Sequence, residues 1–199
     1  MRRGKFIVIE GLDGSGQTTQ VKILNDFLLN KGNDVLTTKE PTLDSESGQE
    51  IRRLLKEHTE IDPLDFQKLF IEDRREHLNN KIIPALKEGK IVISDRYFFS
   101  TFAFGAAHGS NLDDLVELNS NFLYPDLVFL LEVSPKICVE RIKKRGLPAE
   151  FFEKEQKLAK VWEVYKTFPE RFQNIYLING ERNIEEIAKE IREIYETIS

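Results

Sequence analysis

The sequence of 199 residues predicts an α/β fold in which a five-stranded parallel sheet lies between two layers of helices. Three observations predict this fold. Five short segments, most of them apolar, have the length of strands, stretches with helical periodicity separate them, and a glycine-rich loop joins the first segment directly to a helical stretch. Because strand, helix and strand follow one another, the crossovers should be right-handed and the strands parallel.

The predicted strands begin near the N-terminus and recur along the whole chain. They cover residues 6–9, 34–38, 90–94, 127–132 and 175–178. The fourth is an unbroken apolar run, which is typical of a strand that is buried on both faces.

Helical patterns fall between these runs. The first follows the glycine loop and should stop at Lys31 and Gly32. Others are predicted over residues 47–56, 62–88, 98–108, 112–122, 135–144, 151–167 and 184–194. Asp62 and Pro63 suit the N-cap and the first position of their helix. Pro84 should kink or divide the same helix, because proline cannot donate the backbone hydrogen bond.

Composition indicates one soluble globular domain over residues 1–199. The formal net charge of -5, with no long basic run, argues against broad binding of nucleic acid. No apolar stretch approaches the length of a membrane span, and no signal-peptide pattern precedes the first strand. We therefore expect a cytoplasmic protein that binds neither membrane nor nucleic acid. The single cysteine, Cys138, excludes an internal disulfide and a cysteine-based zinc site.

The loop after the first strand predicts a phosphate site. Its glycines allow positive φ angles, so that several backbone N–H groups can turn inward, and the following helix adds its own free N–H donors. The nucleotide-binding residues that we expect are Gly11, Gly14, Ser15, Gly16, Gln17, Thr18 and Thr19. Any glycine-rich strand-to-helix turn could look similar, but the strand before and the helix after favour a nucleotide site.

One position departs from the usual pattern G-x-x-x-x-G-K-[ST]. Gln17 stands where the lysine that spans the terminal phosphates belongs, and its amide carries no charge. Thr18 keeps the hydroxyl that can reach a magnesium ion. The loop should still bind phosphate, while its strongest counter-charge is missing.

Two carboxylates and an arginine should lie beside this loop. Asp13 is inside it, and Asp95 and Arg96 follow the third strand, at the sheet edge where parallel α/β proteins bind ligands. Asp95 could hold magnesium through water. Asp13 could orient an acceptor hydroxyl or the same metal ion, or it could simply form a local turn. Arg96 suits a second phosphate, although it could also pair with Asp13 or Asp95.

A basic cluster in an otherwise acidic chain suggests a lid at about residues 141–150. Arg141 and Arg145 are four residues apart and would share a helix face, and Gly146 and Pro148 follow them. Such a cluster is often only solvated surface. A lid carrying two arginines could supply positive charge that Gln17 lacks and could exclude water.

Phe70 and Arg74 are also four residues apart on a predicted helix. A ring and a guanidinium in this arrangement can stack on a base and bond its edge. Taken alone, Phe70 is more typical of a core and Arg74 of a surface ion pair.

At these positions the chain resembles the thymidylate kinases, over essentially its whole length. The residues that carry the resemblance are Gly11–Gln20 as the glycine loop, Lys39-Glu40-Pro41-Thr42, Leu69-Phe70 with Arg74, Asp95-Arg96-Tyr97, Ser100-Thr101, Ala103-Phe104 and Tyr124-Pro125-Asp126-Leu127. The Asp-Arg-Tyr signature with its downstream serine and phenylalanine is the specific part.

The resemblance implies a nucleoside monophosphate kinase fold of the P-loop NTPase type, with three α/β/α layers and a mobile lid. It implies phosphorylation of dTMP to dTDP with ATP and Mg²⁺, by a homodimer formed through helices that flank the sheet. Gly14 occupies a position that one group of the family fills with arginine, whereas Arg141 and Arg145 match the lid arginines of the other group. The chain is thus similar to the lid-arginine type.

The resemblance also implies roles on the acceptor side. Phe70 would stack on the thymine and Arg74 would bond its edge, while Ser100 would sit near the base. Arg96 would hold the acceptor phosphate, Asp13 would approach the sugar hydroxyl, and Phe104 would disfavour a ribose 2′-hydroxyl. When the donor side is included, the expected catalytic residues are Asp13, Gln17, Arg96, Arg141 and Arg145. The expected metal site consists of Thr18 and Asp95.

A second departure concerns the base. Gly105 stands where many relatives carry a glutamine or threonine that bonds the thymine ring. Two alternatives to a dTMP kinase therefore stay open: a monophosphate kinase with a broader acceptor range, and a nucleotide-binding protein with weak catalysis because of Gln17.

Overall fold

The structure is a computed structural model that describes residues 4–57, 61–144 and 151–198. Its centre is a five-stranded, all-parallel sheet in the order β2-β3-β1-β4-β5. The strands are β1 (Phe6–Gly11), β2 (Val35–Lys39), β3 (Ile91–Asp95), β4 (Leu127–Glu132) and β5 (Ile175–Asn179). The predicted α/β fold and its strands are confirmed, with small shifts at the strand ends.

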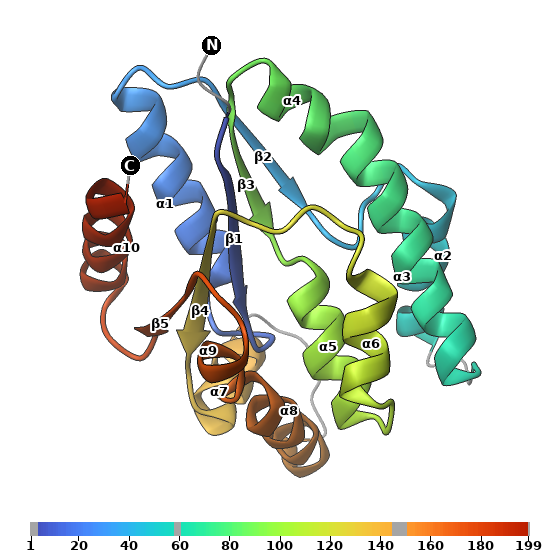
Figure 1. Cartoon of the computed structure of the whole chain (residues 1–199). Helices are drawn as coiled ribbons and strands as arrows, with labels where there is room; N and C mark the ends of the chain where they lie inside the picture. The colour runs from blue at the N-terminus through green and yellow to red at the C-terminus, as the bar shows by residue number, and fades with distance from the viewer. Residues whose placement is uncertain (1–3, 58–60, 145–150, 199) are drawn as a thin grey trace.

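Helices cover both faces of the sheet (Figure 1). They are α1 (Gln17–Asn30), α2 (Glu46–Glu57), α3 (Pro63–His77), α4 (Ile83–Lys87), α5 (Phe98–Ala107), α6 (Leu112–Asn119), α7 (Pro135–Lys144), α8 (Phe151–Tyr165), α9 (Phe168–Arg171) and α10 (Ile184–Ile198), and a π-helix, η1 (Leu78–Ile82), joins α3 to α4. In Figure 1, α1 and α10 lie together on one side of the sheet, and the helices coloured green to orange lie on the other.

The alternation of side chains along β1 divides the core in two. Ile7 and Ile9 point to the face that α1 and α10 cover. Phe6 and Val8 point to the opposite face, where they join a core with residues of α4, α5, α7 and α8. Because all of these positions are fully buried, β1 is fixed from both sides, and the loop at its carboxyl end has a rigid base.

The predicted helix over residues 62–88 is divided, as Pro84 suggested. Asp62 caps α3 by accepting a hydrogen bond from the Asp65 backbone N–H at 3.2 Å. The α-helix ends at His77, and five residues of π-helix follow before α4 begins. Since Pro84 lacks an N–H and its ring crowds the carbonyl one turn earlier, the wider turn of η1 accommodates it.

Two other helices end earlier than their apolar patterns predict. The helix expected over 112–122 ends at Asn119, and Phe122 packs against the core from the following turn. The helix expected over 151–167 ends at Tyr165, and the short helix α9 starts at Phe168. Pro169 explains the second break, because its ring would clash with the Tyr165 carbonyl if α8 continued. Over the described residues, no helix is both long and apolar enough to cross a membrane.

Candidate active site

The glycine loop and the start of α1 surround one pocket together with the ends of β2 and β3 and residues of α7 and α8. Its lining residues are Asp13, Gly14, Gly16, Gln17, Thr18, Thr19, Lys39, Arg96, Ile142 and Lys154. A second pocket lies next to it and shares Thr18 and Lys39 with it, and Asp95 lines this second pocket. The structure therefore brings the predicted loop residues, both predicted carboxylates and Arg96 to one edge of the sheet, where the carboxyl ends of the strands lie.

The loop adopts the backbone that the glycines predict. Gly14 and Gly16 have φ angles of 89° and 107°. A Cβ atom on Gly14 would lie 2.5 Å from the Cys138 carbonyl oxygen of α7, whereas no heavy atom lies within 4 Å of the same point on Gly16. The loop is thus packed against α7 on one side and open on the other. The Ser15 hydroxyl is buried and has no hydrogen-bond partner among the described residues.

The amide of Gln17 is used inside the site. Gln17 is 6% exposed. Its Nε2 donates a hydrogen bond to the Gly11 carbonyl at 3.0 Å, and its Oε1 accepts one from Arg96 Nη2 at 3.3 Å. A neutral group therefore links the glycine loop to the arginine of the predicted acceptor side, at the position where the usual pattern has a cation.

Arg96 is held by several groups. It donates to Asp13 Oδ1 and to Ser100 Oγ, both at 2.8 Å, and its guanidinium lies 5.3 Å from the centre of the Phe104 ring. Burial opposes its charge, but the nearby carboxylates, Asp13 above all, raise the pKa of Arg96 above its ordinary value. Its φ angle of 75° is rare for a residue with a side chain, and such strain is common at functional sites. Of the two carboxylates that Arg96 could pair with, it pairs with Asp13 and not with Asp95. Its contact with a phosphate stays a prediction.

Thr18, Asp95 and Lys39 form a second polar group at the pocket. Thr18 Oγ1 donates to Asp95 Oδ2 at 2.6 Å, and Lys39 Nζ lies 3.1 Å from the same oxygen. Lys39 reaches Asp95 because β2 and β3 pair in register at these two residues. A hydroxyl and a carboxylate oxygen are thus adjacent beside the loop.

A buried carboxylate, that of Glu10, holds Arg96 in place through Ser100. Glu10, at the end of β1, is fully buried and accepts hydrogen bonds from Ser100 Oγ at 2.7 Å and Tyr165 Oη at 2.9 Å. It also accepts one from the backbone N–H of Tyr97 at 2.8 Å. Burial raises the pKa of Glu10, and the positive charge of Arg96 and these hydrogen bonds partly offset the effect. Ser100 is therefore occupied in positioning Arg96.

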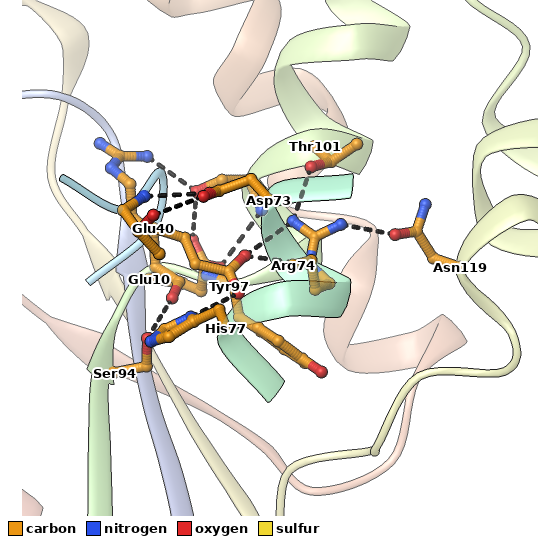
Figure 2. A network of polar contacts seen from close by, with 12 residues as sticks. Glu10, Glu40, Asp73, Arg74, His77, Ser94, Tyr97, Thr101 and Asn119 are labelled. Atoms are coloured by element: carbon orange, nitrogen blue, oxygen red, sulfur yellow. Dashed lines mark hydrogen bonds and ion pairs between the residues drawn. The ribbon is translucent and has the colours of Figure 1, made fainter. Parts of the chain in front are cut away.

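Arg74 lies in the interior of the protein, away from both pockets. It is 1% exposed and donates to Glu40 at 2.9 Å, to Asn119 at 2.6 Å and to Thr101 at 3.0 Å. Figure 2 shows its guanidinium enclosed by these partners. Arg74 forms an ion pair, as expected for an arginine taken alone, but the pair with Glu40 is buried and not on the surface. It connects α3 to the residue that follows β2. Its contact with a base edge stays a prediction.

Phe70 is half-buried on α3, and its ring meets that of Phe66 edge to face, with centroids 5.1 Å apart. Its stacking on a base is likewise untested.

Arg141 connects two backbone segments, the glycine loop and the turn after β5. It donates to the Ser15 carbonyl at 3.1 Å and to the Gly180 carbonyl, just after β5, at 3.0 Å. Arg141 is in the last turn of α7. Arg145 and the rest of the predicted lid, up to residue 150, lie outside the described residues.

Sequence reasoning missed several residues of this site. Lys39 and Lys154 line the pocket, and Glu10 and Tyr165 form the support for Arg96. Lys39 and Glu10 are charged residues at the carboxyl ends of strands, a signal that could have identified them. Lys154 and Tyr165 come from a helix far along the chain, and only the fold brings them here.

Known proteins with similar sequences point to one family. The chain matches the family model "Thymidylate kinase" over residues 9–191. It is 44% identical over 194 residues to a probable thymidylate kinase of Pyrococcus horikoshii, with 95% of this chain and 94% of that protein covered. It is 38% identical over 189 residues to the thymidylate kinase of Desulfotalea psychrophila, with 94% and 92% covered. For the thymidylate kinase of Caldicellulosiruptor saccharolyticus the identity is 35% over 205 residues, with 98% of both chains covered.

The glycine loop, the arginine beyond β3 and the sequence matches over nearly the full length agree. This chain belongs to the thymidylate kinase family.

Proposed function

We propose that this protein transfers the γ-phosphoryl group of ATP to the phosphate of dTMP, giving ADP and dTDP. In this reaction an oxygen of the dTMP phosphate forms a bond to the γ-phosphorus while the bond to ADP breaks. The observation that carries the proposal is the contact between the two halves of the site. Gln17 of the donor loop and Arg96 of the acceptor side are joined by a hydrogen bond of 3.3 Å, so two phosphates bound there would be neighbours.

The residues of the loop fit the donor. Gly14 and Gly16 turn the backbone in the left-handed region, and the space beside Gly16 is open, as a phosphate nest requires. The hydroxyl of Ser15 is buried and has no hydrogen-bond partner among the residues in described positions, so it is a further group that a ligand could satisfy. We assign the triphosphate to residues 11–19, with Gln17 as a neutral donor.

Thr18 and Asp95 fit a magnesium ion. Their oxygens are adjacent, at 2.6 Å, and hydroxyl, carboxylate and water are the ligands that Mg²⁺ prefers. Among the described residues no cluster of three acidic or histidine side chains offers a full protein cage, as expected where phosphates and water complete the shell. The ion would neutralise charge on the phosphates.

Arg96 is the group that we assign to the acceptor phosphate. Its pairing with Asp13 and Ser100 presents a guanidinium that is fixed before the acceptor arrives, which lowers the cost of ordering it. Asp13 is half exposed, so it can turn from Arg96 to an acceptor hydroxyl. Phe104, beside the guanidinium, would limit the room around the sugar.

The charge that Gln17 lacks can come from other residues of the pocket. Lys39 is paired with Asp95 and Arg96 with Asp13, whereas Lys154 forms no ion pair with a carboxylate whose side chain the structure describes. We assign to Lys154, at the start of α8, a share of the transition-state charge. Arg141 and Arg145 keep the roles of lid arginines in the proposal, Arg141 through its position against the loop.

The family also suggests a cytoplasmic homodimer, and this assembly is part of the proposal. The elution volume of the purified protein in size-exclusion chromatography, measured with light scattering, tests it directly.

The experiment that tests the function is an assay of ADP release with ATP and Mg²⁺. We expect release with dTMP, much less with dUMP and dGMP, and little without an acceptor. Equal rates with all acceptors would favour a broader monophosphate kinase. If ADP release is absent, or does not depend on an acceptor, the proposed activity is wrong.

A further inference from the structure

The surroundings of Gly105 on α5 are filled by two other helices. A Cβ atom built on Gly105 would lie 2.7 Å from Leu115 Cδ1 of α6 and 3.2 Å from Gln67 Nε2 of α3. A glutamine or threonine at position 105 would therefore require the side chains of Leu115 and Gln67 to move. In this chain, the base-bonding group that many thymidylate kinases carry at this position is replaced by a glycine with a glutamine amide next to it.

Gln67 is an unusual residue in its own right. It is 7% exposed, yet its Oε1 has no hydrogen-bond partner among the described residues. A buried amide oxygen without a donor costs free energy in the unliganded protein, so such atoms are few in native structures and invite an explanation. A ligand that brings an N–H donor would satisfy it.

The location of Gln67 agrees with a base site. Gln67, Phe70 and Arg74 follow one another at spacings of three and four residues, so they lie along one face of α3. This face meets α5 at two points, where Arg74 donates to Thr101 and where Gln67 adjoins Gly105, one turn further on. Phe104, next to Gly105 in the chain, contacts Arg96. The Gln67 amide thus lies on the same helix as Phe70, which is predicted to stack on the base, and next to the part of α5 that follows Phe104.

We propose that Gln67 reads the base of the acceptor nucleotide, with its Oε1 accepting a hydrogen bond from N3–H of thymine. The proposal rests on the proposed function and extends it to base specificity. Thymine and uracil present an N3–H donor, whereas cytosine presents a lone pair at N3, which a carbonyl oxygen repels. Gln67 is thus a specificity-determining residue that selects 2,4-dioxopyrimidines, in place of a side chain at position 105.

Two acceptors that share the methyl group and the sugar test this assignment, dTMP and 5-methyl-dCMP. For the unmodified enzyme we expect kcat/KM to favour dTMP by at least a hundredfold, since a site built around a substrate N–H rejects analogues that lack it. Gln67→Leu should lower kcat/KM for dTMP by roughly tenfold to a hundredfold and leave the value for 5-methyl-dCMP nearly unchanged. The KM for ATP should not change. Gln173→Leu, an exposed glutamine before β5, is the matched control and should leave both acceptors unaffected.

The stability of the same variant separates specificity from structure. Because the Gln67 oxygen has no hydrogen-bond partner in the part of the chain that the structure describes, Gln67→Leu should keep or raise the melting temperature of the protein without ligand. Gln67→Met, which is closer in shape, is measured beside it, so that a packing defect in one variant does not decide the result.

The outcomes are distinct. If the unmodified protein does not phosphorylate dTMP, the proposed function itself has failed. If it does, and if both Gln67 variants keep the original preference for dTMP over 5-methyl-dCMP, Gln67 does not read the base. An equal loss with both acceptors, accompanied by a lower melting temperature, would also overturn the assignment and mark Gln67 as structural.

Discussion

Gly14 and Gly16 allow the packing of the glycine loop to be tested quantitatively. We consider replacing each of them by alanine. At Gly14 the new Cβ would meet the Cys138 carbonyl at 2.5 Å, and the φ angle is 89°. At Gly16 the φ angle is 107°, but the space around the new atom is open. The two variants therefore share backbone strain and differ in the clash.

The magnitudes follow from these contacts. Left-handed backbone costs an alanine about 1–2 kcal/mol, and forcing an extra carbon into packed surroundings costs about 1–3 kcal/mol more. Gly16→Ala should then lower the free energy of unfolding by about 1–2 kcal/mol, and Gly14→Ala by about 2–5 kcal/mol. For a domain of this size, 1 kcal/mol corresponds to a shift of roughly 2–4 °C in melting temperature.

The assay is urea unfolding of the purified protein without nucleotide, followed by circular dichroism. Gly109→Ala, with φ 100° and open space at a site far from the loop, serves as the control for strain alone. Should Gly14→Ala be no less stable than Gly16→Ala, α7 does not pack against the loop as described. The same result would mean that position 14 has room for a side chain.

Three further predictions concern charge. Gln17→Lys should raise the single-turnover rate with dTMP by about tenfold or more, because a cation would meet charge that develops on the transferred group. Lys154→Ala should slow the same step, while Lys160→Ala, an exposed lysine two turns further along α8, should not change it. Because the pKa of Glu10 is raised, the folded state holds this proton more tightly than the unfolded state. Stability should therefore fall as the pH rises from about 4.5 through the raised pKa, by up to about 1.4 kcal/mol per pH unit, and Glu10→Gln should reduce this slope in urea unfolding.

Each of these expectations has a result that contradicts it. A folded Gln17→Lys enzyme that is no faster would mean that other cations already compensate in full. Equal effects of Lys154→Ala and Lys160→Ala would remove Lys154 from the site. An identical pH dependence in Glu10→Gln and in the unmodified protein would show that Glu10 titrates normally.

The architecture was predictable because its signals are local. Four of the strands are short, mainly apolar segments, β2 adds threonines, and the glycine loop identifies the edge of the sheet at which ligands bind. Helix ends were harder, because an apolar pattern does not reveal where the backbone can no longer continue. Pro169 ends α8 although Trp162 and Tyr165 lie on its buried side, and Asn119 ends α6 before the apolar Phe122.

The candidate site was predictable where it is contiguous in sequence. Asp13 lies in the glycine loop, Thr18 in the first turn of α1 and Asp95 at the end of β3, all of them at places with known geometry. The environment of Arg74 was not, since Glu40 and Asn119 are distant in sequence and only the folded chain brings them to α3. The environment of Gln67 could not be predicted either, because only the folded chain places it next to Gly105.

The order of the strands has a consequence for how the chain folds. β1 is the first strand to be synthesised and the central one in the sheet, and its neighbours are β3 and β4, where Phe6 aligns with Val92 and Ile7 with Leu127. On the ribosome, this apolar strand must wait until residue 95 of the 199 has emerged before its first partner, β3, is available, and β4 follows only at residues 127–132. Pairings between such distant segments slow folding and leave strand edges exposed to aggregation. Productive folding of this protein should therefore be slow and sensitive to concentration, a behaviour that follows from the position of its first strand.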